Sequence, residues 1–434
     1  MNDKKTKVFI RPAGGGVDPA AEAIFSAAGL QKRIAAAQEI YIKVNGIDFK
    51  PYCYTAPEVL ESVIKRCRDA GARRVFVMEN CTQSNFTRLV FKETGYTALC
   101  RRLGAKPLFL DEMPHARVRL PNMDDEVRIP RVVMKIADDP ESFLYINVPK
   151  LKCHSMSTVT VGVKNQLGFV HQQDRIRDHN HRLHRKIADV YHVIRPAFTL
   201  VDALTAVFYG HYPPQGALGE CLVRLDLLFG GEDTLAVDAV GARLLGYGVD
   251  EVEHLRLLRE DGAGCGNLED IEIDGPFNPP AEPYPFDIMN RFPPDVTIVR
   301  GAEMCCREGC RKNTETLLQT LYLDFGGGGG FAIVMGKGCD PAGVDALDMP
   351  VLLAGMCATD EHLDRLRRAG KKVYASYGCN NLARTAECLT KLSGVSFMRM
   401  MPHPYSSIYH LLAARLRRTH ARLPGPLALL GIVK

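Results

Sequence analysis

Short apolar runs alternate with amphipathic stretches along the first 275 residues. The runs KVFIRP, EIYIKVNG, RRVFVMEN and KPLFLDE alternate with helical patterns such as DPAAEAIFSAAG, PEVLESVIKRCRDAGA and one long stretch, FTRLVFKETGYTALCRRLGA. Short strands separated by helices of about 10–20 residues indicate βα units and a mostly parallel sheet. The pattern predicts a doubly wound α/β domain over residues 1–275.

Residues 116–138 interrupt this rhythm. Their sequence, ARVRLPNMDDEVRIPRVVMKIAD, alternates apolar and polar positions around an Asn-Met-Asp-Asp turn, which is typical of a β-hairpin. The buried strand FLYINVPKLK, the helix HRKIADVYHVIRP and the strand FTLVDAL follow, and LDLLFGG leads into the helical pattern DTLAVDAVGARLLG. We therefore expect a hairpin excursion from an otherwise regular α/β domain.

A proline-rich segment separates this domain from a second one. Residues 276–294 cannot continue a helix or a central strand, which predicts a linker. Residues 295–405 then repeat a strand and helix pattern, which predicts a smaller α/β domain built of βα units. The tail, 406–434, is basic and then apolar; we expect a helix and a strand packed on the body, with a peripheral membrane anchor or a partner-docking helix as the alternative.

Composition narrows the possible classes of protein. With 434 residues, 46% of them hydrophobic, and a formal net charge of +5, the chain has the composition of a soluble globular protein and gives no indication of a nucleic-acid partner. No export signal or membrane-spanning run is visible, so we expect a cytoplasmic location. In that reducing compartment the 14 cysteines are better explained by metal binding or burial than by disulfides.

Seven of the cysteines fall between residues 305 and 388, and most of them follow predicted strands. The strands FAIVMG, PVLLAG and KVYASYG lead into Cys339, Cys357 and Cys379, and VTIVRG leads into AEMCCREGC. Because the carboxyl ends of parallel strands meet at one edge of a sheet, we expect these thiols to converge. Four thiolates are the ligand set of an iron–sulfur cluster or a structural zinc ion.

The spacing of the cysteines favours an iron–sulfur cluster over a zinc site. Zinc sites usually carry paired C-x2-C knuckles, which this domain lacks, so we expect a [4Fe–4S] cluster with zinc as the alternative and packed thiols as the third possibility. We expect Cys388 to be a core residue and FGGGGG (325–330) to be a flexible loop beside the cluster. The expected ligands are Cys310, Cys339, Cys357 and Cys379, with Cys305 or Cys306 as alternatives to Cys310.

Residues 148–190 of the first domain are dense in histidine and lysine, at positions that interrupt expected core. Histidine titrates near neutrality and the pKa of a lysine falls on burial, so together they can bind an anionic substrate and move its proton. Asp238, on a helix face, is a weaker candidate that could instead cap a helix or pair with Arg243. We expect His154, Lys164, His184 and Asp202 to be catalytic, and Lys152, Ser155 and Asn165 to bind substrate.

The same block resembles a known family. PKLKCHS, VKNQLG, His184 ahead of KIADVYHVIRP, IRPAFTLVDA and GGEDTLAVDAVGARLLGY are similar to motifs of the prokaryotic domain-of-unknown-function family 362 over about residues 38–275. The family's activity is not established, and its members are often associated with iron–sulfur cysteines. Here the cysteine-rich domain stands in place of a short ferredoxin-type module, so the cluster assignment depends on the cysteine pattern alone.

A fainter similarity is to the nickel-pincer lactate racemases, which place a histidine, a lysine ten positions on and a further histidine in one α/β domain. His154, Lys164 and one of His179, His181 and His184 follow that order. The similarity implies a racemase-like or epimerase-like enzyme as an alternative.

These observations lead to a first hypothesis for function. We expect an iron–sulfur oxidoreductase that acts on an anionic small molecule. Because no dinucleotide fingerprint is present, we expect a ferredoxin-like protein to donate its electrons. The alternatives are an iron–sulfur electron carrier or metal-assembly factor, a racemase-like or epimerase-like enzyme, and a zinc-stabilised binding protein. A homo-oligomer is compatible with each of them.

Overall fold

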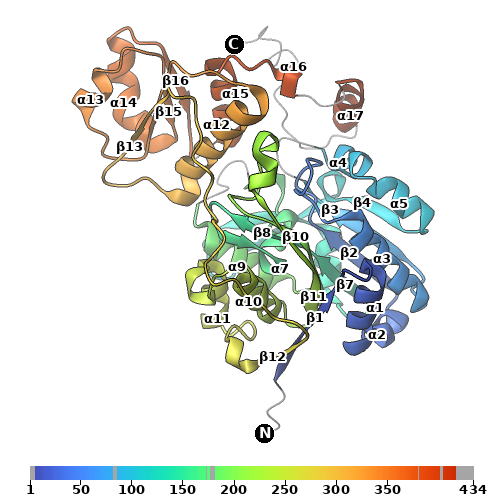
Figure 1. Ribbon diagram of the computed structural model, residues 1–434. Coiled ribbons are helices and arrows are strands. Elements are labelled where there is room, and N and C mark those ends of the chain that lie inside the picture. The colour runs from blue at the N-terminus through green and yellow to red at the C-terminus, as the bar shows by residue number, and fades with distance from the viewer. Residues whose placement is uncertain are drawn as a thin grey trace.

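The computed structural model contains two large β-sheets covered by helices, together with a separate two-stranded hairpin (Figure 1). The larger sheet is built from residues before 275 and the smaller one from residues after 296. The structure describes residues 5–81, 86–172, 174–175, 181–379, 381–400 and 404–416.

The larger sheet has ten strands in the order β12-β1-β11-β10-β7-β2-β3-β4, with β8 paired to β10 and β9 paired to β8. Strand β11 runs antiparallel to both of its neighbours, whereas the other pairs along this path are parallel. The predicted α/β class with a mostly parallel sheet is therefore confirmed. The strands are β1 (Thr6–Pro12), β2 (Glu39–Val44), β3 (Val75–Glu79), β4 (Lys106–Phe109), β7 (Phe143–Val148), β8 (Lys150–His154), β9 (Thr158–Thr160), β10 (Phe198–Val207), β11 (Leu222–Gly231) and β12 (Ile271–Asp274).

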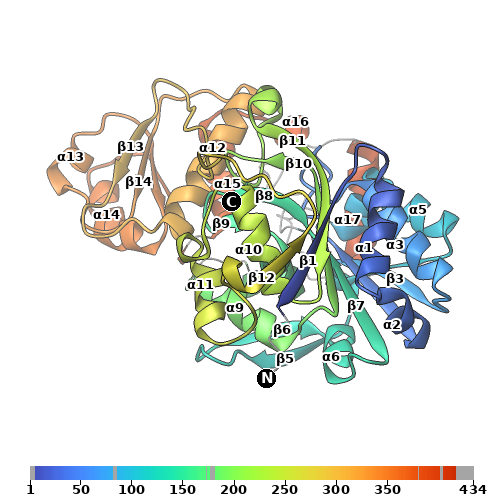
Figure 2. The ribbon, with the colours of Figure 1, turned by 60° about the horizontal axis from the view of Figure 1, so that its bottom comes forward.

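Helices cover both faces of this sheet, and each face has its own hydrophobic core (Figure 2). One face packs against α1 (Val17–Ala27), α2 (Leu30–Ala36), α3 (Pro57–Asp69), α4 (Thr87–Glu93) and α5 (Tyr96–Arg102). The opposite face packs against α6 (Arg131–Asp138), α7 (Gly162–Asn165), α9 (Leu183–Val193), α10 (Thr234–Leu244) and α11 (Glu253–Glu260).

The structure corrects two predicted elements. The hairpin exists as β5 (His115–Arg119) and β6 (Glu126–Pro130), but the last residues of the expected hairpin form α6, because Val133 and Ile136 face the core at helical spacing. The long amphipathic stretch forms two helices, α4 and α5, because Gly95 adopts a left-handed conformation between them, with φ of 80°.

Pro149 divides the expected strand FLYINVPKLK in two. Proline has no N–H group for a strand ladder, and the chain leaves β7 at this residue and continues as β8. Strand β8 pairs with β10 on one side and with the short β9 on the other. This change of neighbours carries Lys152 and His154 past the end of the central strands.

The smaller sheet is parallel throughout, in the order β13-β14-β15-β16. Its strands are β13 (Thr297–Arg300), β14 (Ala332–Met335), β15 (Val351–Ala354) and β16 (Val373–Ser376), and its helices are α12 (Lys312–Phe325), α13 (Pro341–Asp345), α14 (Met356–Arg368) and α15 (Leu382–Leu392). Cys388 of α15 is buried in the core, as predicted. The glycine run 325–330 joins the end of α12 to the start of β14, so it lies at the edge of the sheet opposite the cysteine loops; its expected place beside the cluster was wrong.

Two helices follow this domain, α16 (Phe397–Met400) and α17 (Pro404–Leu416), and α17 lies against α4 of the larger domain (Figure 1). Residues 275–296, between β12 and β13, form neither helix nor strand. Among the helices of the described ranges, none combines the length and apolar character needed to cross a bilayer.

Candidate active site

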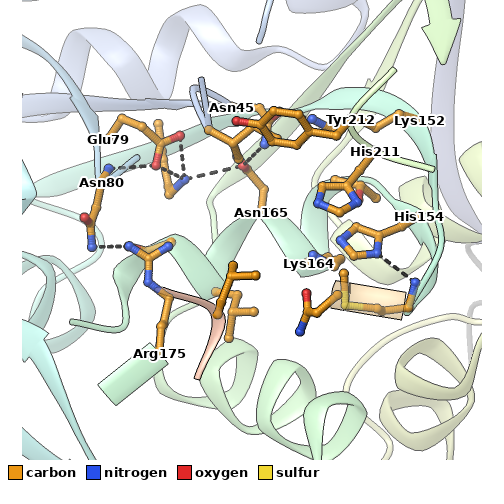
Figure 3. Close-up of a pocket in the computed structure, with 18 residues that line it drawn as sticks. Asn45, Glu79, Asn80, Lys152, His154, Lys164, Asn165, Arg175, His211 and Tyr212 are labelled. Atoms are coloured by element: carbon orange, nitrogen blue, oxygen red, sulfur yellow. Dashed lines mark hydrogen bonds and ion pairs between the residues drawn. The ribbon is translucent and has the colours of Figure 1, made fainter. Parts of the chain in front are cut away.

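A cavity of about 120 Å³ opens where β2, β3 and β8 end (Figure 3). Ligands gather at this edge of parallel sheets because each strand there leads into a loop. The smaller domain closes one side of the cavity with Asn313 of α12 and Leu382 of α15. The other lining residues are Lys43, Asn45, Ile47, Glu79, Asn80, Lys152, His154, Met156, Thr160, Lys164, Asn165, Leu167, Gly168, Arg175, His211 and Tyr212.

Cationic side chains outnumber carboxylates in this lining. Lys43 pairs with Glu79 through Nζ–Oε distances of 2.9 and 3.1 Å. Glu79 is the one carboxylate among the lining residues, which leaves Lys152, Lys164 and Arg175 without a carboxylate partner inside the cavity. Buried charges are normally paired, so this excess creates a positive potential that favours an anionic ligand.

The Lys43–Glu79 pair explains a glycine of the VKNQLG motif. A Cβ atom built on Gly168 would lie 3.0 Å from Oε1 of Glu79 and 3.1 Å from Nζ of Lys43. The backbone can pass this close only because glycine has no side chain. The motif therefore packs its own backbone onto the ion pair at the base of the cavity.

A chain of amides fixes the polar wall. The Nζ atom of Lys152 donates to Oδ1 of Asn45 at 2.8 Å, and Nδ2 of Asn45 donates to Oδ1 of Asn165 at 3.0 Å. In turn, Nδ2 of Asn165 donates to Oδ1 of Asn147 at 2.8 Å. Because both ends of the Asn165 amide are occupied, this side chain orients its neighbours and has a positioning role.

Helix α7, which carries Lys164 and Asn165, is held from below by Asp238 of α10. The carboxylate accepts the backbone N–H groups of Gly162 at 2.7 Å and Val163 at 2.9 Å. These are N–H groups that a helix start leaves without an intrahelical partner. Burial raises the pKa of Asp238 to about 8, while the two backbone donors act in the opposite direction.

Two histidines form a second wall. The rings of His154 and His211 are parallel within 3°, with their centroids 3.8 Å apart. Nδ1 of His154 accepts the backbone N–H of Met156 at 3.2 Å, which leaves Nε2 to carry the proton of the neutral ring. Two stacked imidazolium rings would repel each other, so the pair favours holding at most one positive charge.

Burial lowers the pKa values of two lysines of the cavity, Lys152 and Lys164, toward neutrality. Burial lowers the pKa of Lys152 to about 8. Burial, together with the charges of Lys152 and Arg175, lowers the pKa of Lys164 to about 7. Within the described part of the chain no hydrogen bond or ion pair to Lys164 is found, so its ammonium group is available to a ligand and to proton transfer.

The structure brings four of the predicted residues to this cavity, namely Lys152, His154, Lys164 and Asn165. Ser155 is buried outside the lining. Asp202 is also outside it: its carboxylate lies 3.1 Å from Nζ of Lys150 and accepts the backbone N–H of Ala56, at the start of α3. Asp202 therefore stabilises the junction of β8, β10 and α3.

His184 lies in a second cavity, of about 420 Å³, between α9, α11 and the cysteine loops. Its Nε2 atom is 3.6 Å from carboxylate oxygens of Glu253 and Glu308. His181 lines the same second cavity, and His179 lies outside the described residues. The residue order shared with lactate racemases thus brings His154 and Lys164 into one cavity without His181 or His184.

Sequence reasoning missed most of the polar lining. Lys43 and Asn45 end the strand motif EIYIKVNG, and Glu79 and Asn80 end RRVFVMEN. Charged residues at the end of otherwise buried strands were the available signal. Arg175, His211, Tyr212 and Asn313 come from loops and from a helix of the second domain, and nothing in their local sequence distinguished them.

Apart from Cys388, which lies within α15, the cysteines of the smaller domain lie in the segments that follow the carboxyl ends of its strands. Gly338, Gly355 and Gly378, which immediately precede or adjoin these cysteines, have φ angles of 76°, 93° and 81°. Such conformations favour glycine and turn the chain sharply out of the strand. The segment between β13 and α12 crosses over the other loops and brings its own cysteines to the same edge.

Five cysteines, Cys305, Cys306, Cys310, Cys357 and Cys379, occupy the loops at this edge. The thiols of Cys305 and Cys310 are in hydrogen-bonding contact. A Cβ atom on Gly355, two residues before Cys357, would lie 3.2 Å from Cβ of Cys310. A Cβ atom on Gly309 would lie 3.2 Å from Cβ of Cys306 and 4.0 Å from Sγ of Cys379.

Cys339 lies elsewhere. Its side chain is buried in the core on the α13 and α14 face of the sheet, with Sγ 3.7 Å from the carbonyl oxygen of Met335. Cys305 and Cys310 pack on the opposite, α12 face. In the described ranges, no three or more His, Cys, Asp and Glu side chains are arranged as ligands of a metal ion.

The two sites are neighbours along the chain as well as in space. Asn313 follows Cys310 by three residues and Leu382 follows Cys379 by three, and both Asn313 and Leu382 line the lysine-rich cavity. The thiol-bearing loops therefore lead directly into the wall of that cavity.

Comparison with known proteins places this geometry in context. Thylakoid-associated protein sll1697 of Synechocystis sp. (strain ATCC 27184 / PCC 6803 / Kazusa) is 26% identical over 204 residues, a match that covers 43% of this chain and 56% of the relative. The chain thus spans little more than half of that protein's length. A crystal structure of a Thermotoga maritima protein, a structural genomics target, aligns with a TM-score of 0.32 at 9% identity, covering 84% of this chain and 81% of that one.

Residues 40–243 match the model of a domain of unknown function, DUF362. The match contains the motifs that suggested this family, the last of them up to Arg243, and every lining residue of the cavity except Asn313 and Leu382. The chain therefore carries a DUF362 domain over residues 40–243.

Proposed function

We propose that the protein is an iron–sulfur oxidoreductase whose DUF362 domain binds a small organic anion in the lysine-rich cavity. The observation that carries the proposal is the excess of cations over carboxylates among the lining residues, with Lys152, Lys164 and Arg175 surplus to the Lys43–Glu79 pair. A volume of about 120 Å³ fits a ligand of a few non-hydrogen atoms, such as a short carboxylic acid or a phosphate ester fragment. The presence of such a pocket supports an enzyme over an electron carrier, which needs no substrate pocket.

The roles of the side chains follow from their contacts. Lys152 and Arg175 hold their cationic groups in fixed positions, because each donates to a backbone carbonyl oxygen, that of Cys53 at 3.2 Å and that of Cys81 at 2.9 Å. Lys164 holds or releases a proton at Nζ near neutral pH. The amide of Asn165 keeps Lys43 and Asn45 in place.

The chemistry of the donors at the cysteine edge fits an iron–sulfur cluster. We propose that its ligands come from Cys305, Cys306, Cys310, Cys357 and Cys379, and that Cys339, buried on the other face, is a core residue. When bound, a [4Fe–4S] cluster supplies or accepts single electrons. With no dinucleotide fingerprint in the chain, a ferredoxin-like protein is the proposed electron donor.

Anaerobic purification followed by visible and electron paramagnetic resonance spectroscopy, with iron, sulfide and zinc quantified, tests the cluster. We expect brown protein with about four irons per chain, loss of iron in a Cys310→Ala/Cys357→Ala variant, and retention of iron in Cys339→Ala. Colourless protein containing one zinc ion would assign the thiols to a structural zinc site. Wild type with neither metal would leave the anion site as the whole of the function.

The location of the protein is part of the proposal. Thiols persist in the cytoplasm, where we expect the protein to work. The printed name of the Synechocystis relative refers to a membrane, the thylakoid. Fractionation of cells into cytosol and membranes, followed by detection of the protein, distinguishes the two locations.

A further inference from the structure

Helix α17 presents its apolar side chains away from the protein. Tyr405, Ile408, Tyr409, Leu412 and Leu416 have exposed fractions between 43% and 91%. They occupy positions i, i+3, i+4, i+7 and i+11, which form one continuous helical face.

On the side of α17 that faces the body, the side chains that the structure describes near its start are the serines Ser406 and Ser407. Ser407 is buried, and Oγ of Ser406 lies 2.7 Å from Nζ of Lys92 and 3.4 Å from a carboxylate oxygen of Glu93, both on α4. A helix that packs on a protein core normally turns its apolar face inward. Here the orientation is reversed, so the body of the protein does not cover the apolar face.

The charge of the segment after Glu387 indicates what the apolar face of α17 contacts. No aspartate or glutamate occurs after Glu387, whereas the same segment contains seven lysines and arginines, four of them between Arg415 and Arg422. Basic residues beside an exposed apolar helical face are attracted to anionic lipid headgroups, and tyrosine rings favour the lipid–water boundary. A second copy of the chain would bring like charges together, which disfavours a dimer through this face.

We propose that α17 and the basic residues after it bind peripherally to the surface of an anionic membrane. The apolar face inserts among the headgroups and the arginines pair with lipid phosphates. This lies outside the cavity and the cysteine edge, and it is independent of the proposed enzymatic activity.

Flotation of the full chain with vesicles tests the proposal. We expect binding to vesicles of phosphatidylcholine containing phosphatidylglycerol, little binding to phosphatidylcholine alone, and release by high salt. The Tyr405→Ser/Tyr409→Ser variant should bind about tenfold or more weakly, because two aromatic rings no longer enter the interface. The matched control, Tyr52→Ser/Tyr377→Ser, removes two exposed tyrosines from elsewhere on the protein and should bind like the wild type.

Three results would overturn the proposal. Wild type that stays unbound on anionic vesicles would show that the face serves another purpose. Equal binding by the two double variants would assign the interaction to another surface. A dimer in light scattering that the Tyr405→Ser/Tyr409→Ser change abolishes, without vesicle binding, would assign the face to a second copy of the chain.

Discussion

The carboxylate of Asp238 lies 2.7 Å from the backbone nitrogen of Gly162, at the first turn of the helix that carries Lys164. A Cβ atom on Gly162 would lie 2.8 Å from the same carboxylate and 2.6 Å from Cγ2 of Thr234. Gly162 and Asp238 therefore fit together only because residue 162 has no side chain. Together, Gly162 and Asp238 fix the position of Lys164 from the side opposite the ligand.

Replacing Asp238 should therefore weaken ligand binding, although Asp238 itself does not contact the ligand. In Asp238→Asn one of the two backbone donors faces an amide N–H group, at a cost of about 1–3 kcal/mol of unfolding free energy. We expect weaker binding of small carboxylates in calorimetry and a lower unfolding midpoint. Arg243→Ala is the control: its Nη1 contacts only the carbonyl oxygen of Gly246, at 3.4 Å, and its loss should leave binding unchanged. Equal effects of both substitutions would contradict the positioning role.

Two buried lysines should respond in opposite ways to the same substitution. Lys150→Met leaves the carboxylate of Asp202 buried without its cation and should cost about 3–5 kcal/mol. Lys164→Met removes a desolvated ammonium group and should raise the unfolding free energy at pH 7 by about 1 kcal/mol or more. Urea denaturation followed by circular dichroism measures both.

The stability gained in Lys164→Met should depend on pH, and the pKa of Lys164 gives the direction of that dependence. Because the pKa of Lys164 is lowered from 10.5 to about 7 by folding, the unfolded chain binds the proton more tightly between these values. The wild type should therefore gain stability as the pH rises above 7, and the advantage of Lys164→Met should shrink. An advantage that stays constant up to pH 10 would show that Lys164 keeps its ordinary pKa.

Anion binding should follow the protonation of the same lysines. Lys164 and Lys152 carry charge below about pH 7 and pH 8, so affinity should fall as the pH rises through this range. Titrations with acetate, lactate and inorganic phosphate between pH 6 and 9 should show a loss of about tenfold per pH unit above the pKa. Lys164→Gln should bind weakly with a flatter profile, whereas Lys106→Gln, at an exposed lysine of β4, should match the wild type.

Crowding at Gly355 should affect metal content. Gly355→Ala places a methyl group 3.2 Å from Cβ of Cys310 at a φ of +93°, and should lower the iron bound per chain. Gly370→Ala is the matched control, since its φ is +72° and no atom lies within 4 Å of the new Cβ. Both variants place an alanine at a positive φ. A similar loss of iron in the two would assign the effect to strain and not to the Cys310 contact.

Periodicity was enough to predict the class of the fold and the strands that end at the two sites. The turn between α4 and α5 and the start of α6 were missed because a single glycine and a proline at position 130 decided them against a continuous pattern. His154 and Lys164 were identified because polar residues interrupted a buried strand and a tight turn.

The remaining site residues required three-dimensional information. Asp202 and Lys164 look alike in sequence, as charged residues beside apolar runs, yet Asp202 meets Lys150 across a strand pair and Lys164 meets open space. Cys339 follows its strand as Cys357 and Cys379 do, but its side chain turns to the other face of the sheet. Which face a loop residue takes is decided by packing that spacing does not encode.

The cavity has two origins within one chain. The cations, the histidines and every lining amide except that of Asn313 lie between residues 43 and 212, inside the DUF362 domain, while Asn313 and Leu382 come from beyond it. A protein that joined the same domain to a different neighbour would keep the charge that attracts the ligand and exchange the surface that closes over it. Exchanging the second domain could then change which anions are bound, while the charged half of the cavity in the DUF362 domain stays the same.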